Sequence, residues 1–251
     1  VAELQPDIDA YDKAQTKLRT IEQRFPDAMK KSLLQYAIEG KLVPQLKEEG
    51  TAKELLAEIR SEKARLIKEK KIKKTKPLPA ITDDEKPFDI PDSWEWARFG
   101  DISINMDSER IPLSVTQRRK LDKIYDYYGA SGIIDKVDQY LFDRPLMLIG
   151  EDGANLLART KPIAFIARGK YWVNNHAHVI DFPNGIDMKY MTFYMNAINL
   201  AAYVTGTAQP KMNQARMNSI LIAIPPLAEQ HRIVAKLEEL LPLCQHLTAN
   251  P

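Results

Sequence analysis

The stretch that decides the fold reads GTAQPKMN at residues 206–213 and IPPLAEQ at residues 224–230, followed by a helical pattern that runs to the chain end. The first string is a polar loop, because its Gly and Pro interrupt regular structure and most of its other residues form hydrogen bonds. The Pro-Pro pair ends the segment before it and is well placed to begin a helix. This order predicts a folded domain that closes with a loop and is followed by an amphipathic helix.

The apolar positions of that last helix are spaced alternately by four and three residues: Ile233, Leu237, Leu240, Cys244 and Leu247. This heptad spacing keeps one stripe of a helix against a partner helix. Pro242 falls inside the pattern and predicts a kink or an interruption. About two heptads are too short to be stable alone in water, so the helix needs a partner from this chain or another.

A matching seam lies near the start of the chain, at Tyr11, Ala14, Leu18, Ile21 and Phe25. Pro26 is expected in the first turn of a next helix, and Gly40 is expected to cap that helix. The two seams predict a surface for a partner helix, with Leu18, Ile21 and Phe25 on one side and Ile233, Leu237 and Leu240 on the other.

Another helix is predicted from Thr51, where Thr51 and Glu54 fit a capping box. Between Arg60 and Lys76 there are nine basic residues against two acids. The simpler interpretation is a solvated helix end with a flexible tail. The alternative is a patch that follows the phosphates of a nucleic acid.

The rest of the chain divides by composition. Residues 77–93 hold four prolines among acidic and small residues and form a Pro-rich linker. Residues 94–226 contain short β-type runs (146–149, 163–167 and 178–180) and one predicted helix (189–204). The fold class is therefore α+β. One mixed domain at 94–226 lies between a helical region at 1–76 with its linker and the start of a second long helix at 227–251, and the helices pair in coiled-coil fashion.

Composition excludes some classes of protein. The 251 residues hold 44% hydrophobic residues and no apolar run near the roughly 18 residues of a membrane span. The N-terminus lacks the pattern of a signal peptide. The single Cys244 excludes an internal disulfide and fits a cytoplasmic location. A formal net charge of +2 is only weak support for nucleic-acid binding.

No catalytic residues are predicted. Adenine methyltransferases need an Asn or Asp before Pro-Pro and an aromatic after it, and the IPPL string at 224–227 has neither. Neither a phosphate-binding loop nor a dinucleotide fingerprint occurs. Asp27, Glu39 and Lys41 match a nuclease spacing, but the residues between them are helical, so the two carboxylates should not converge on a metal.

No metal site is predicted either. His176 and His178 would share one face of a strand, yet no third His or Cys lies near, so we expect hydrogen-bonding histidines beside the core. Glu151 and Asp152 could hold a hard cation, although a plain turn is the stronger interpretation.

Candidates for contact with DNA are easier to identify. In the 206–213 loop, Gln209 and Asn213 could pair with adenine, and Lys211 could reach a guanine edge or a phosphate. The alternative is that this loop only packs the domain onto the next helix. Arg118, Arg119 and Lys120 form a basic cluster suited to phosphate contact or to solvation. Weaker candidates are Arg110, Arg144 and Arg159.

Four blocks, in order, resemble the specificity subunits of type I restriction-modification systems. They are FPD at 25–27 leading into KSLLQYAIEGKL at 31–42, then IPDSWEW at 90–96, then GEDGAN at 150–155 with WVNNHAHV at 172–179, and finally the loop, Pro-Pro pair and helix at the C-terminal end. Such subunits carry two target-recognition domains separated by two long antiparallel helices. The resemblance implies that this chain corresponds to half of one.

The resemblance also implies a function. The chain would read one DNA half-site, dock the modification (methyltransferase) subunits and, through them, meet the restriction subunit. It would catalyse nothing and hold no cofactor, since S-adenosylmethionine, Mg²⁺ and ATP would bind the partners. A homodimer through the terminal helices is a further expectation. The alternatives are a self-contained methyltransferase or nuclease, and a coiled-coil adaptor without a DNA role.

Overall fold

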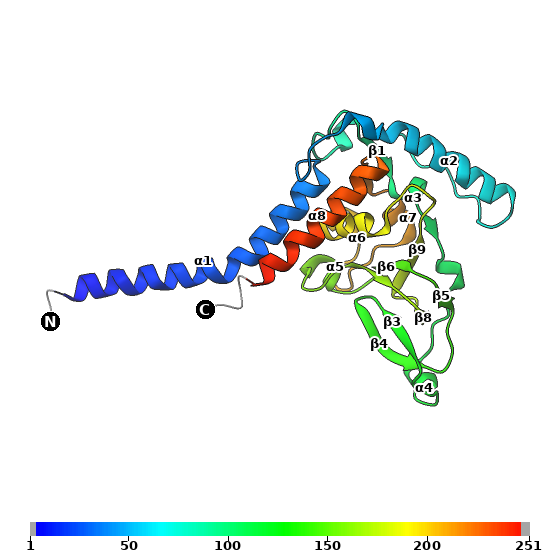
Figure 1. The fold of residues 1–251 in the computed structure, drawn as a ribbon. Helices are drawn as coiled ribbons and strands as arrows, with labels where there is room; N and C mark the ends of the chain where they lie inside the picture. The colour runs from blue at the N-terminus through cyan, green and yellow to red at the C-terminus, as the bar shows by residue number, and fades with distance from the viewer. Residues whose placement is uncertain (1–3, 247–251) are drawn as a thin grey trace.

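A long helical arm carries a mixed domain in the computed structural model, which describes residues 4–246. Helix α1 (Gln5–Ile38) projects far from the domain, and helix α8 (Leu227–His246) runs back along its inner half in the opposite direction (Figure 1). Helix α2 (Ala52–Lys68) crosses the far side of the domain, after the short η1 (Lys47–Glu49). Among the described helices, none has the length and hydropathy needed to cross a membrane.

Three small sheets form the domain. Strand β1 (Glu95–Arg98) pairs antiparallel with β10 (Leu221–Ile224), so the first and last strands of the domain lie together. The second sheet has the order β2 (Ile104–Asn105), β9 (Ala177–Asp181), β6 (Leu146–Gly150) and β7 (Ala164–Ala167), all antiparallel. The third has the order β4 (Gly132–Val137), β3 (Tyr125–Gly129), β8 (Lys170–Val173) and β5 (Phe142–Asp143), with only β3 and β8 parallel.

Short helices connect these strands: η2 (Asp83–Glu85), α3 (Phe99–Ile102), η3 (Asp107–Glu109), α4 (Val115–Arg118), α5 (Asn155–Ala158), α6 (Met188–Ala197), η4 (Ala201–Tyr203) and α7 (Gln214–Asn218). The three predicted β-type runs are strands β6, β7 and β9. The predicted α+β class with long terminal helices is confirmed.

Strand β6 is buried along its whole length because both of its faces are covered. Its alternate residues Met147 and Ile149 join the main core with α1, α6 and α8. Leu146 and Leu148, which point to the opposite face of the strand, join a second cluster with Tyr171 and Val173 of β8. A period of two residues along a strand therefore divides one apolar run between two cores.

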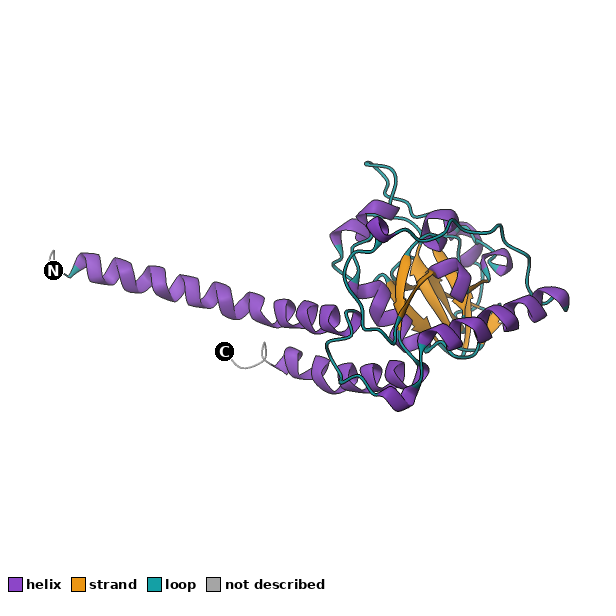
Figure 2. Cartoon of the chain, turned by 90° about the horizontal axis from the view of Figure 1, so that it is seen from above, coloured by secondary structure: helices purple, strands orange, loops and turns teal. Residues whose placement is uncertain are grey.

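The predicted seam of α8 is covered by this chain itself. Ile233 and Leu237 are fully buried in the cluster that holds Leu34 and Ile38 of α1 and Tyr190 of α6. Leu240 is half-buried. Figure 2 shows α8 beside the inner half of α1. Leu247, the last position of the predicted seam, lies outside the described residues.

The seam of α1 is different, because its outer half has no cover within residues 4–246. Leu18 is 55% exposed, Ile21 53% and Phe25 46%. Tyr11 is exposed as well. Burial within the chain begins only at Pro26 and Leu34, where α8 and the domain reach the helix. An apolar stripe on the outer half of the arm is therefore open to another helix.

Four local predictions are corrected. Pro26 does not begin a helix but lies inside the continuous α1, where intact turns on both sides hold it. Of the kink or interruption predicted at Pro242, the interruption is not found, because α8 continues through that residue. The Thr51 side chain makes no cap hydrogen bond, and the backbone N–H of Ala52 donates to the Ser93 carbonyl instead. The helix predicted at 189–204 ends at Ala197. Arg159 donates to the Met195 carbonyl in its last turn, and the Asn196 side chain bonds the backbone of Ile163 and Ala164 at strand β7.

Two further expectations hold. Gly40 caps α1 with φ +70°, and the N–H of Lys41 donates to the Tyr36 carbonyl at 2.9 Å. Asp27 and Glu39 are separated by on the order of three turns of the same helix, so the nuclease-like spacing brings no carboxylates together.

The Pro-rich segment at 77–93 is fixed to the domain. Arg98, only 5% exposed, donates to the carbonyls of Pro79 and Ala80 at 3.0 and 3.3 Å. Its guanidinium also meets both carboxylate oxygens of Glu85 at 2.9 Å. A buried guanidinium that satisfies its donors in this way holds the segment against strand β1.

Candidate nucleic-acid interface

The loop that follows η4 is closed at its base. Thr205 and Lys211 exchange two backbone hydrogen bonds of 2.8 Å, and residues 205–209 between them are exposed. Gly206 has φ +82°, and a Cβ there would lie 2.7 Å from the Gln209 carbonyl oxygen. Glycine is therefore required, both for its backbone conformation and for the close approach. We call residues 205–213 the polar loop.

The polar loop is attached to the turn after β6. The N–H of Met212 donates to the Glu151 carbonyl at 2.8 Å, and the N–H of Gly153 donates to the Pro210 carbonyl at 2.9 Å. Met212 is fully buried. These bonds fix the loop while its tip stays in solvent.

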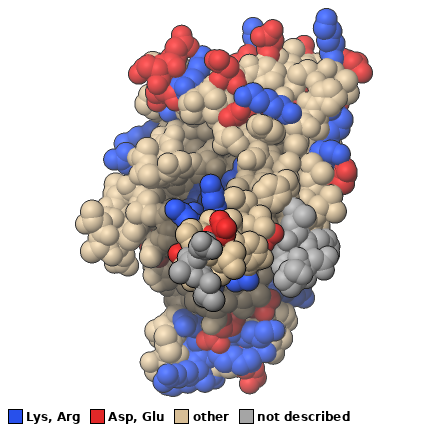
Figure 3. Space-filling model, turned by 90° about the vertical axis from the view of Figure 1, so that its left-hand side faces the viewer, with Lys and Arg blue, Asp and Glu red and all other residues tan. Residues whose placement is uncertain are grey.

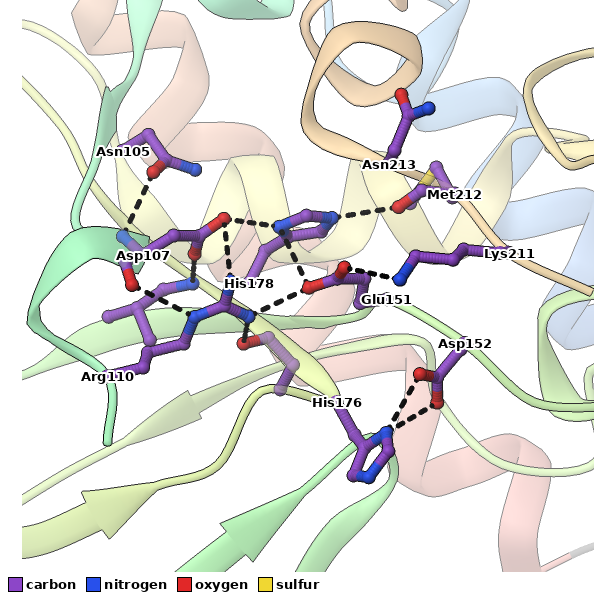
Figure 4. A network of polar contacts seen from close by, with 12 residues as sticks. Asn105, Asp107, Arg110, Glu151, Asp152, His176, His178, Lys211, Met212 and Asn213 are labelled. Carbon is purple, nitrogen blue, oxygen red and sulfur yellow. Dashed lines mark hydrogen bonds and ion pairs between the residues drawn. The ribbon is translucent and has the colours of Figure 1, made fainter. Parts of the chain in front are cut away.

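A buried network of charges lies beneath the loop (Figure 4). Arg110 meets Glu151 at 2.9 Å and Asp107 at 3.3 Å. The Lys211 ammonium lies 3.2 Å from the other oxygen of Glu151. Two carboxylates thus face two permanent cations across three separate segments of the chain.

His178 connects this network to the loop. Its Nδ1 lies 2.6 Å from an Asp107 oxygen, and its Nε2 lies 2.8 Å from the Met212 carbonyl oxygen. The buried ring therefore connects Asp107 to the backbone of the polar loop.

The electrostatics of the two carboxyls follow from these contacts. Burial alone would raise the pKa of Asp107, but the hydrogen bond and charge of His178 act together with hydrogen bonds from Asn105 and Val179 and leave that pKa below its ordinary range. Burial acts on Glu151 in the same way, and the contacts with Arg110 and His178 again leave its pKa lowered. Both groups therefore favour the ionised form that the network needs.

The same cluster has ligand atoms spaced for a metal ion, since atoms of Asp107, Glu151 and His178 all lie within 4.8 Å of one another. Arg110, however, already contacts both carboxylates, and Lys211 contacts one of them. Because protein cations already balance the two negative charges, we interpret the cluster as an ion-pair network.

The two histidines do not share a strand face, contrary to the prediction. His178 lies in β9 and is buried, whereas His176 lies in the turn before β9 and is exposed. The Nδ1 of His176 lies 2.8 Å from Asp152. The turn departs from the strand because Asn174 accepts a hydrogen bond from the backbone of His176.

The three loop candidates are brought together on the polar loop but differ in their contacts. Gln209 is exposed, and Lys211 is half exposed beside Glu151. Asn213 caps α7, because its side-chain oxygen accepts from the N–H of Arg216 at 3.0 Å. Their contact with DNA stays a prediction.

The basic cluster at α4 is divided. Arg118 bonds Asp135 at 2.9 Å and lies 4.7 Å from the centre of the Tyr127 ring. Hydrogen bonds lower the pKa of Asp135 to about 2; the bond from Lys123 has the largest effect, and the bond from Arg118 contributes. Arg119 and Lys120 are exposed at the end of α4. Figure 3 shows Lys and Arg gathered at the lower end of the molecule, where α4 lies in Figure 1.

The weaker candidates Arg110 and Arg159 have structural roles. Arg110 belongs to the network, and Arg159 bonds the last carbonyls of α6, including that of Met195 at 3.3 Å. Arg144 is half exposed and lies 2.6 Å from Asp181. No hydrogen bond or ion pair between described residues joins the polar loop to α4.

One further buried group, at the junction of arm and domain, has no signal in the sequence. Glu229, only 1% exposed, accepts from the Trp94 indole at 2.9 Å and from the Gln45 amide at 2.6 Å. Burial raises the pKa of this carboxyl despite those bonds. Glu229 thus ties the start of α8 to the segments that follow α1 and precede β1.

Fold and site together describe a mixed domain on a helical arm that presents a fixed polar loop. Residues 91–250 match the family described as the type I restriction modification DNA specificity domain. The chain belongs to this family.

Two curated relatives from Escherichia coli are similar over most of this chain. The specificity subunit of the type I restriction enzyme EcoEI is 32% identical over 250 residues, which cover 89% of this chain and 42% of the relative. The EcoAI specificity subunit is 32% identical over 248 residues, covering 88% and 41%. The chain thus spans about two fifths of the length of these relatives.

A solved structure has a similar fold. The HsdS subunit from Thermoanaerobacter tengcongensis superposes with a TM-score of 0.51 at 15% identity, covering all of this chain and 53% of that one. At this identity the likeness concerns the fold alone.

Proposed function

We propose that this chain recognises one half-site in double-stranded DNA and holds modification subunits in place on it, without supplying a catalytic group. The observation that carries this proposal is the family match, which covers the whole domain and α8. The curated relatives are named as specificity subunits of type I restriction enzymes. S-adenosylmethionine, Mg²⁺ and ATP would bind the partner subunits.

The polar loop is the part of the domain that we assign to base reading. Its tip is exposed, its base is closed, and its amide and ammonium groups are those that pair with base edges and phosphates. A fixed loop loses little conformational freedom on binding, which favours affinity. The exposed Arg119 and Lys120 would contact phosphates.

Two substitutions in the loop are expected to act differently. Lys211→Ala should weaken binding to all sequences and reduce the salt dependence by about one phosphate contact. Gln209→Ala should relax one position of the site, by roughly 1–3 kcal/mol of discrimination. Both effects are measured by assembling each variant with the modification subunit and titrating it against a panel of duplexes at several salt concentrations.

Lys211 has an ion pair with Glu151 as well as its proposed contact with DNA. In the same assay, Glu151→Gln separates these two roles, because it removes the ion pair and keeps the ammonium. If both loop variants, assembled with the modification subunit, methylate the wild-type sites at the wild-type rate, the loop is structural and base reading lies elsewhere.

The exposed stripe of α1 supports the assembly part of the proposal. Leu18, Ile21 and Phe25 would pack against helices of a second recognition half, supplied by a longer chain or by a second copy. A twofold dimer would place identical domains at opposite ends of the arm, so its site would be a palindrome whose spacer follows helix length.

Binding experiments with and without the modification subunit test the proposed function. The chain alone should bind DNA weakly and with little specificity, because its net charge is only +2. The modification subunit should raise affinity and specificity together. Equal affinity with and without that subunit would contradict the assembly role.

A further inference from the structure

The end of α2 carries a dense group of lysines. Lys68, Lys70, Lys71, Lys73, Lys74 and Lys76 are all exposed, and Glu69 is the only acid among residues 68–76. We call this segment the basic tip. Glu69 is already paired with Lys71 at 2.8 Å and Arg65 at 3.1 Å. Within residues 4–244, no ion pair involves Lys70, Lys73, Lys74 or Lys76.

The helix that leads into the basic tip is anchored on the domain. Leu55, Leu56 and Ile59 are buried in the main core. One turn further on, the Lys63 ammonium donates to the carbonyls of Gly100 and Ser103 at 2.7 and 2.8 Å. Burial lowers the pKa of Lys63 to about 8. Because its charged donor bonds two backbone carbonyls of the domain, Lys63 fixes α2 in position.

The chain is anchored again directly after the tip, where Arg98 holds the carbonyls of Pro79 and Ala80. The turn between the anchors is ordered, since the N–H of Lys71 donates to the Leu66 carbonyl at 2.9 Å. Lys70 takes the left-handed position of this turn with φ 58°, where glycine is the usual residue. The basic tip is therefore a loop fixed at both ends.

The anchors also place the tip relative to the polar loop. Helix α2 packs on α3, and α3 packs on α7, which Asn213 caps. The contact is close, because a Cβ on Gly100 of α3 would lie 2.8 Å from Asn218 of α7. Figure 1 shows α2 passing over α3 and α7 with its end beyond the body of the domain. Helix α2 is therefore connected through one intervening helix, α3, to the helix that the polar loop caps.

We propose that the basic tip is a sequence-independent binding site for the phosphate backbone of duplex DNA flanking the half-site. Exposed ammonium groups without ion-pair partners gain most from a polyanion, because each phosphate contact releases a condensed counterion. Lysine is a point charge that positions a backbone and does not need to read a base. The inference rests on the proposed function, since it requires DNA at the domain.

The test compares two variants of the full chain with the same change in charge. One replaces Lys70, Lys73, Lys74 and Lys76 with Gln. The control replaces Lys13, Lys17, Lys30 and Lys31, which are exposed on α1, with Gln. Each variant, like wild type, is assembled with the modification subunit and titrated against three duplexes over a range of salt. The duplexes are the mapped site alone, the site with flanks of about one helical turn, and an unrelated sequence of equal length.

We expect the tip variant to lose the affinity that flanks add and to show a slope of log K against log salt smaller by about 3 to 4, at about 0.9 per phosphate. At low salt this is a loss on the order of tenfold to a hundredfold. Its preference for the site over the unrelated duplex should remain. The control should keep the wild-type slope and the gain from flanks.

An unchanged slope in the tip variant, or an equal loss in the control, would overturn the proposal. Unaltered DNA binding combined with loss of the modification subunit would also overturn it, and would assign the tip to an acidic protein surface. A wild-type chain that prefers no sequence, alone or with the modification subunit, would instead contradict the proposed function.

Discussion

Leu237→Glu is expected to destabilise the chain itself, whereas Leu18→Glu is expected to leave the fold intact and block assembly. Leu237 is fully buried against α1 and α6, so a glutamate there loses its packing and buries an unpaired charge. The expected cost is on the order of 4 kcal/mol or more. Leu18 is 55% exposed, so its replacement should cost little. Urea unfolding measures the first effect and sedimentation the second.

Leu243→Glu is the matched control, because Leu243 lies on the same helix as Leu237 and is 56% exposed. It should unfold like wild type. A Leu237→Glu chain that keeps wild-type stability but loses self-association would mean that the α8 seam faces another chain. If the wild-type chain sediments as a strict monomer at micromolar concentration and Leu18→Glu changes nothing, the two-copy arrangement is contradicted.

His178→Leu is expected to have the second large effect. It leaves the Asp107 carboxylate and the Met212 carbonyl without the hydrogen bonds that His178 supplies. The cost should be about 3 kcal/mol, since a buried charge loses its partner. The polar loop should also loosen, which amide hydrogen exchange at Met212 would detect. His176→Leu, at the exposed histidine paired with Asp152, should cost less than about 1 kcal/mol.

The pH dependence of stability checks the same network. The folded pKa values of Asp107 and Glu151 lie below their ordinary values of 3.8 and 4.5. Their contribution to stability is therefore full above those ordinary values and is lost as the pH falls below them. His178→Leu removes a cause of the lowering, so the variant should lose less stability on acidification. Identical pH profiles for wild type and variant would contradict the assignment of His178.

Local patterns predict the long terminal helices and three of the ten described strands, but not the contacts between elements. The apolar runs at 146–149 and 178–180 are strands, and the heptad spacing at the C-terminal end is helix α8. Heptad spacing does not identify the partner of that seam, since it describes one face of a helix and not what covers it. Pro26 shows the limit of a local rule, because tertiary packing holds a proline inside α1.

The network beneath the loop was out of reach for a different reason. Asp107, Glu151, His178 and Lys211 lie far apart in the sequence and meet only because β6 and β9 pair and the loop returns to them. Each residue alone resembles an ordinary surface charge. The polar composition of the 206–213 string did identify the exposed loop, although not the buried contacts that fix it.

Mapping of methylated sites in the reconstituted complex tests the central claim most directly. The complex contains this chain, the modification subunit and S-adenosylmethionine, and it is supplied with DNA of many sequences. We predict methylation at one defined sequence, no methyl transfer by the chain alone, and a changed half-site when residues 94–226 are exchanged for those of a relative. Methyl transfer by the chain alone, or a site that the exchange leaves unaltered, would contradict the account.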